Sequence, residues 1–207
     1  MILRKAMQLL RSILGRKHIS GPNDSAYFAD TFVRRGCEYY ASARFAMHAG
    51  QSYISGNLFH HAVEMLLKAG LANNGTSLSE LRDMGHRLRK LWRAYKDQHT
   101  EADLERHNKT INGLDKFEDI RYPNPDLHSI GVAMEWSSKP FEVKTFGGLK
   151  NPKQYPLRVS SIDDLVADIL KTSLWNPGVF MGNNEAALEA VKRHNEHSIF
   201  LTTVMKG

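Results

Sequence analysis

The sequence predicts an all-α protein, built as one helical bundle that contains a short extended insertion. Apolar residues recur at spacings of three and four through most of the chain, which is the period of an amphipathic helix. Clusters of Gly, Asn and Pro divide these stretches into segments of ordinary helix length. Residues 129–160 depart from this pattern, because β-branched and aromatic residues become more frequent there.

Composition narrows the classes of protein and partner. Of the 207 residues, 42% are hydrophobic and 24% are charged, as in an ordinary globular domain. The formal net charge of +6 favours an anionic partner, nucleic acid first and an acidic membrane second. No Pro- or Ser-rich linker divides the chain, so we expect one domain over residues 24–201. The single Cys37 suits a cytoplasmic protein without disulfides, and no apolar run is long enough to predict a transmembrane segment.

Residues 1–20 are predicted to form a basic amphipathic helix ahead of this domain. One face carries Leu3, Met7, Leu10 and Leu14, and the other side carries five Lys and Arg residues. Such a helix resembles a membrane-surface or targeting segment. The more ordinary interpretation is a terminal helix that packs on the domain or on a second copy of the chain.

Two helices are expected next, over residues 24–49 and 57–72. The connection between them is short, so they should be antiparallel neighbours. On the first helix, Gly36 is small enough to let a neighbouring helix approach closely, and Cys37 lies on an apolar stripe and should be buried. The second helix carries a predicted polar stripe of Asn57, His61, Glu64 and Lys68.

A third helix is predicted to start near Gly85, and it carries the densest cluster of positive charge in the sequence. One interpretation is a solvated helix face, and the other is a surface that contacts a phosphate backbone. The candidate nucleic-acid-binding residues are Arg82, Arg87, Arg89, Lys90, Arg93 and Lys96.

A fourth helix is predicted to begin with Thr100 as its N-cap and to end near Arg121. Its apolar face continues through Phe117 toward Arg121, and Pro123 stops the helix. His128 follows Arg121 after six residues. An arginine and a histidine held together can act on a phosphate, because the guanidinium fork binds its oxygens and the imidazole moves a proton.

The remaining chain is predicted to hold short strands and then two more helices. Within the 129–160 insertion, strands are expected over residues 130–136, 141–146 and 154–159. A helix should start at Ser161 with a cap completed by Asp164, and the last helix should run over residues 184–197. The histidines lack the spacing of a known metal site, so neither a metal nor another cofactor is expected.

Three segments follow one another along the chain: FHHAVEMLLKA at residues 59–69, GHRLRKL at 85–91 and IRYP at 120–123. In this order they resemble the HEPN superfamily of nucleotide-binding helical domains. The resemblance covers about residues 25–125. It implies an up-and-down helical bundle that usually forms a homodimer and binds RNA or a nucleotide. The N-terminal helix and the 129–160 insertion, which we expect between the fourth and fifth bundle helices, are not covered by the resemblance.

The resemblance implies two functional branches. In one, a metal-independent endoribonuclease of the toxin or defence kind uses the ribose 2′-hydroxyl as nucleophile. Arg121 and His128 match its Arg and His, and Asn124, Glu64 and Tyr122 are candidates for supporting residues. This chain departs from the family pattern at Tyr122 and Pro123, which prevent a continuous helical turn after Arg121. The other branch is a non-catalytic module that binds nucleotides or nucleic acid, or accompanies a protein partner such as a nucleotidyltransferase.

Overall fold

The fold is helical, as predicted, in the residues that the computed structural model describes. These are residues 25–117, 130–136, 153–181 and 185–204. Helices and the turns between them account for nearly all of these residues, and one two-stranded sheet accounts for the rest. The expected helix over 1–20, the expected strand over 141–146 and the residues Arg121, Tyr122, Asn124 and His128 lie outside the described residues.

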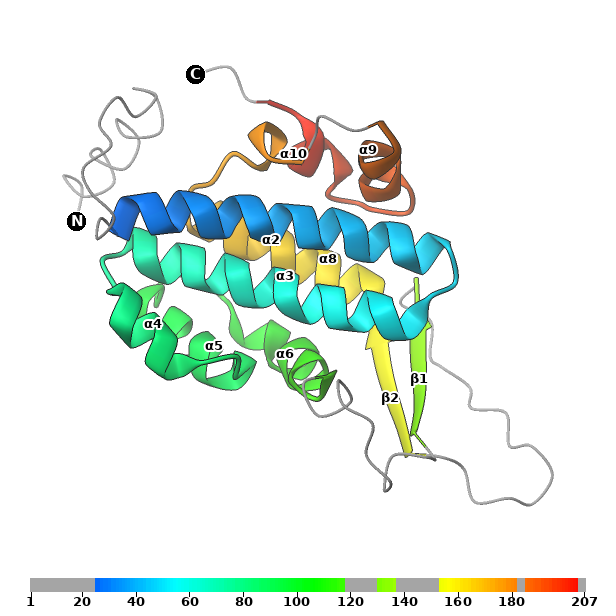
Figure 1. Cartoon of the computed structure of the whole chain (residues 1–207), viewed down its shortest axis with the longest axis horizontal. Coiled ribbons are helices and arrows are strands. Elements are labelled where there is room, and N and C mark those ends of the chain that lie inside the picture. Colours follow the sequence, from blue (N-terminus) through cyan, green and yellow to red (C-terminus); the bar gives the residue numbers. More distant parts are fainter. Residues whose placement is uncertain (1–24, 118–129, 137–152, 182–184, 205–207) are drawn as a thin grey trace.

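Two long helices, α2 (Ser25–His48) and α3 (Ser52–Asn73), form the centre of the bundle. They run side by side in Figure 1. Three shorter helices lie below them, namely α4 (Leu78–Met84), α5 (Leu88–Gln98) and α6 (Asn108–Asp115), and two lie above them, α9 (Glu185–Lys192) and α10 (Ser198–Thr202). A Cβ on Gly36 of α2 would lie 2.7 Å from the Leu66 side chain of α3, which confirms the predicted close approach. Cys37 is fully buried, also as predicted.

Helix α3 begins at Ser52, five residues earlier than predicted, so Gly56 lies inside it. A Cβ on Gly56 would lie 2.0 Å from Cε1 of Phe117. Here glycine is needed for space, because the ring of Phe117 packs directly on the backbone of α3. The predicted polar stripe of this helix is also wrong in part, since Glu64 and Lys68 are buried.

Helix α4 (Leu78–Met84) was not predicted, although the sequence contains its capping box. The Ser77 backbone N–H donates to Glu80 at 2.8 Å, and the Glu80 backbone N–H donates to Ser77 Oγ at 3.3 Å. The third predicted helix begins later than Gly85, because Gly85 has a φ of +64° and ends α4. Helix α5 covers Leu88–Gln98.

The predicted start of the fourth helix at Thr100 is wrong. A short 3-10 turn, η1 (Glu105–His107), precedes α6 (Asn108–Asp115). Two side-chain contacts hold the chain at this point: Trp92 Nε1 donates to Asn108 Oδ1 at 2.7 Å, and His107 Nε2 lies 2.7 Å from Asp168 Oδ2. These tertiary contacts favour a break in the predicted fourth helix. The apolar residues of the sequence keep the helical period through this region, so the break could not be predicted from them.

Strands β1 (Ile130–Glu135) and β2 (Lys153–Arg158) confirm two of the three predicted strands. They pair in parallel, with Ile130 opposite Lys153 and Glu135 opposite Arg158. The sheet lies at one end of the bundle beside α6, where a Cβ on Gly113 would be 2.7 Å from Leu157.

Helix α8 (Val159–Thr172) follows β2 directly, and the predicted Ser161–Asp164 cap is wrong. Arg158 takes the N-cap position without a side-chain hydrogen bond, while Asp164 lies 2.7 Å from His197 Nε2. After the short turn η3 (Pro177–Val179), the last predicted helix, over residues 184–197, ends earlier than expected, because α9 covers Glu185–Lys192. A further helix, α10 (Ser198–Thr202), was not predicted. His194, with a φ of +54°, lies in the break between α9 and α10.

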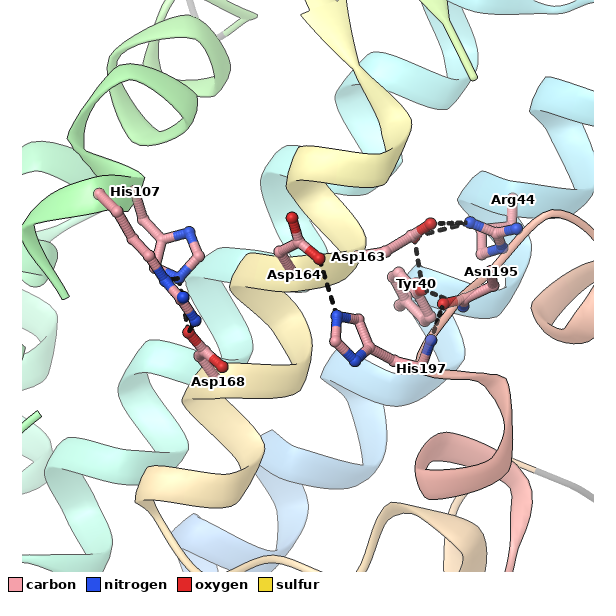
Figure 2. Close-up of polar contacts among 9 residues, drawn as sticks. Tyr40, Arg44, His107, Asp163, Asp164, Asp168, Asn195 and His197 are labelled. Carbon is pink, nitrogen blue, oxygen red and sulfur yellow. Dashed lines mark hydrogen bonds and ion pairs between the residues drawn. The ribbon is translucent and has the colours of Figure 1, made fainter. Parts of the chain in front are cut away.

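A buried polar network joins α2 to α8 and to the segment after α9 (Figure 2). Nη1 of Arg44 donates to both oxygens of Asp163, at 2.6 and 2.5 Å, and the Tyr40 hydroxyl donates to the same carboxylate at 2.6 Å. Asn195 Nδ2 donates to the Tyr40 hydroxyl at 2.9 Å. Burial raises the pKa of Asp163 to about 6, and the charge of Arg44 acts in the opposite direction. The network therefore pairs a buried charge and fixes α8 against α2.

Candidate nucleic-acid interface

An open depression of about 870 Å³ lies between α5 and α6, and most of the side chains that line it are basic. Five of them are Arg or Lys, against a single carboxylate. The lining residues are His86, Arg87, Arg89, Lys90, Arg93, Asn112, Asp115 and Lys116. We call this surface the basic depression.

The amphipathic character of α5 places these charges at the surface. Leu88, Leu91 and Tyr95 are fully buried against the bundle, and Trp92 is nearly so. Arg89 and Arg93 are one turn apart and are exposed. The residue types that pack the core and those that bind anions thus occupy opposite sides of one helix.

The cations of the basic depression differ in how far they are neutralised. Arg89 Nε donates to Asp115 at 2.8 Å, and Lys90 Nζ donates to the backbone oxygen of Asp83 at 2.9 Å. Among the described residues, the side chains of Arg87 and Arg93 form no hydrogen bond or ion pair, and both are exposed. These two guanidinium groups keep all their donors available to an anion.

Four of the six predicted nucleic-acid-binding residues line the basic depression, and two do not. Arg82 lies on α4 and is exposed outside the lining. Lys96 donates to Glu105 at 2.6 Å and to Asn108 at 3.3 Å. Lys116 lines the depression from the α6 side and was not predicted, because its sequence position shows no clustering with α5.

A buried carboxylate, Glu64 of α3, lies next to the basic depression. It accepts a hydrogen bond from Lys68 Nζ at 2.7 Å, and His86 Nδ1 lies 3.0 and 3.1 Å from its two oxygens. His61 Nδ1 is 3.5 Å away. Burial by itself raises the pKa of Glu64, but the hydrogen bonds from His61, Lys68 and His86 and the charge of Lys68 outweigh it, so that the pKa is about 2. Glu64 is therefore ionised at neutral pH.

A second depression, of about 770 Å³, lies over the start of α8 and the segment between α9 and α10. Trp136 lines it, together with Asp164, which is held by His197 (Figure 2). Here acidic and histidine side chains predominate, so this surface is less suited to a polyanion than the basic depression. Within the described ranges, no three His, Cys, Asp or Glu side chains are grouped in a way that would hold a metal ion.

The residues predicted to be catalytic, Arg121 and His128, and two of their candidate supporting residues, Asn124 and Tyr122, lie outside the described residues. The third supporting candidate, Glu64, is described, and its partners are Lys68, His86 and His61. The contact with His86 could not be predicted from periodicity, because His86 lies in the turn between α4 and α5, 22 residues along the chain from Glu64. The roles of Arg121 and His128 remain a prediction.

The helix order and the basic depression define an all-α bundle with one basic face. The HEPN domain family matches residues 29–138, which is more than half of the chain, and the protein belongs to this family. Membership is consistent with a nucleotide- or RNA-associated function. No curated protein and no solved structure matches the chain. None of the helices in the described part combines the length and apolar character that a membrane span requires.

Proposed function

We propose that this HEPN protein binds single-stranded RNA in the basic depression. The observation that supports the proposal most strongly is the grouping of five Arg and Lys side chains from two helices around one concave surface. A phosphate backbone bound there would release counterions, which supplies much of the affinity for nucleic acid. Because Arg87 and Arg93 have no partner among the described residues, no existing ion pair has to be broken for them to bind phosphate.

A salt titration of RNA binding tests this proposal. Each phosphate contact on a single strand contributes about −0.7 to the slope of log affinity against log salt. The double variant Arg87→Gln/Arg93→Gln should therefore flatten the slope by about 1.4 and weaken the binding of all sequences alike. Filter binding to several unrelated single-stranded RNAs measures both effects.

Arg35→Gln provides the matched control, because Arg35 is an exposed arginine on α2, outside the basic depression. It should leave the slope within error of the unmodified protein. RNA binding that does not depend on salt, or a slope that changes equally in the control, would contradict the proposed surface.

We propose as a second function that the bound RNA is cleaved without a metal, with Arg121 and His128 as the catalytic pair. This candidate is favoured by the position of Arg121, only five residues along the chain from Lys116, which lines the basic depression. Arg121 would stabilise negative charge on the phosphorane, and His128 would transfer the proton. The alternative is a non-catalytic binding module that acts with a protein partner.

An RNA cleavage assay in excess chelator separates these alternatives. His128→Ala and Arg121→Gln should abolish cleavage while most of the salt-dependent binding remains, because each acts at one scissile phosphate. Cleavage that survives in His128→Ala would remove His128 from the mechanism. Binding without any cleavage in the unmodified protein would favour the non-catalytic module.

A further inference from the structure

His86 stands between the buried carboxylate of Glu64 and the basic depression. Its side chain is 58% exposed and lines the depression, whereas the Glu64 side chain is fully buried. Nδ1 of the ring lies 3.0 and 3.1 Å from the two oxygens of Glu64. The ring is thus attached to the interior of the bundle through one nitrogen, while its other nitrogen, Nε2, has no partner among the described residues.

The charge of Glu64 decides where the imidazole proton lies. An ionised carboxylate can only accept hydrogen bonds, so Nδ1 of His86 must be the donor. A neutral imidazole has only one N–H, which leaves Nε2 with its lone pair. Glu64 therefore selects the tautomer in which Nε2 of His86 is a hydrogen-bond acceptor.

The position of His86 is fixed from two sides. Glu64 is itself held by Lys68, one turn along α3, at 2.7 Å. In the sequence, His86 is preceded by Gly85, whose φ of +64° ends α4, and is followed by Arg87, the N-cap residue of α5. A side chain anchored in this way binds a ligand group with little additional loss of conformational freedom.

The hydrogen-bond acceptor Nε2 of His86 is unusual among the side chains that line the basic depression. Arg and Lys side chains can only donate, and the carboxylate of Asp115 already accepts from Arg89 at 2.8 Å. Asn112 contributes a side-chain amide to the lining. Hydrogen-bond donors suit the phosphate oxygens of a nucleic acid, which only accept. A hydrogen-bond acceptor suits a hydroxyl group, which can donate. In RNA, the 2′-hydroxyl is the sugar donor next to the 3′ phosphate, and DNA lacks it.

We propose that Nε2 of His86 accepts a hydrogen bond from a ribose 2′-hydroxyl, so that the basic depression distinguishes RNA from DNA. This inference rests on the proposed RNA-binding function and adds to it the residue that selects RNA over DNA. Arg87 and Arg93 bind the phosphates that both nucleic acids share, and His86 reads the group that only RNA carries. Glu64 is a positioning residue, because it acts on the ligand only through His86.

The test compares three single strands of one sequence, namely RNA, DNA and 2′-O-methyl RNA, by fluorescence anisotropy. The unmodified protein should bind RNA about 3- to 10-fold more tightly than the other two, the range expected for one hydrogen bond. His86→Phe keeps a ring of similar shape without an acceptor, and it should bind all three strands with nearly the same affinity as the unmodified protein has for DNA. Repeating the titrations in His128→Ala protein checks that RNA cleavage does not cause the difference.

Arg87→Gln is the control for a phosphate contact, and it should weaken binding to all three strands by a similar factor. Equal affinity of the unmodified protein for the three strands would overturn the inference and leave RNA binding in place. An RNA preference that survives in His86→Phe would overturn it as well. If none of the strands binds, the proposed function itself fails, which is a different result from the loss of discrimination alone.

Discussion

At the scale of the residue, Glu64 links the stability of the fold to the proposed recognition of RNA. Its single carboxylate pairs with buried Lys68 and orients His86. The sequence shows Glu64 and Lys68 one turn apart on a helix, which alone is typical of an exposed ion pair. Their burial follows from the packing of α4 and α5 onto α3, which brings His86 to the same carboxylate. This tertiary contact is invisible to helical periodicity.

Glu64→Gln should lower the free energy of unfolding by about 3 kcal/mol at pH 7, because it leaves Lys68 buried without a counterion. Urea unfolding measures this change. Glu189→Gln is the matched control, since Glu189 is exposed and its pair with Lys192, at 3.5 Å, should contribute nothing measurable. An equally small effect of both substitutions would show that the buried pair does not stabilise the fold.

The stability difference between the unmodified protein and Glu64→Gln should depend on pH, and its direction follows from the pKa of Glu64. The pKa of Glu64 is lowered from 4.5 to about 2 in the folded state, so the stability it contributes is present above pH 4.5 and is lost as the pH falls toward 2. The difference in stability between the unmodified protein and Glu64→Gln should therefore narrow between pH 5 and pH 2. A difference that stays constant over this range would contradict the ionised, buried carboxylate.

At the scale of the element, the contact between α3 and Phe117, which follows α6, depends on one glycine. Gly56→Ala would place a Cβ 2.0 Å from the ring of Phe117 and should destabilise the protein by about 1–3 kcal/mol through overpacking. Thermal unfolding should show a fall in Tm of several degrees. Phe117→Leu in the same chain should recover part of the loss, because it makes room for the added methyl group. If the changes in stability caused by Gly56→Ala and Phe117→Leu are strictly additive in the double variant, the added methyl group does not clash with the ring of Phe117.

The elements differ in how well the sequence predicts them. Helices α2 and α3 were predicted because their apolar period extends over many turns, whereas the short α4 was missed despite its Ser77–Glu80 capping box. The break before α6 depends on contacts of His107 and Asn108 with distant residues, so no local pattern marks it. Arg87, Arg89, Lys90 and Arg93 of the basic depression were predicted from one cluster, but Lys116 joins them only in the folded chain.

At the scale of the whole molecule, we propose a homodimer that uses the first long helices. Phe45 at the end of α2 is 55% exposed, and Ile54 at the start of α3 is 53% exposed. Exposed apolar residues on the two neighbouring long helices suit a contact between copies of the chain. Light scattering should give twice the chain mass of 23.5 kDa, and Phe45→Lys should shift the protein toward the single-chain mass. A single-chain mass for the unmodified protein at high micromolar concentration would exclude this dimer and any active site shared between copies.

NMR of the arginine side chains tests most directly whether RNA binds in the basic depression. Titration of single-stranded RNA into protein with labelled arginine should shift the Nε–H signals of Arg87 and Arg93 and leave that of Arg35 unchanged. Assignment by Arg→Gln variants identifies each signal. Shifts confined to other arginines, such as Arg193 beside the second depression, with Arg87 and Arg93 unaffected, would contradict RNA binding in the basic depression.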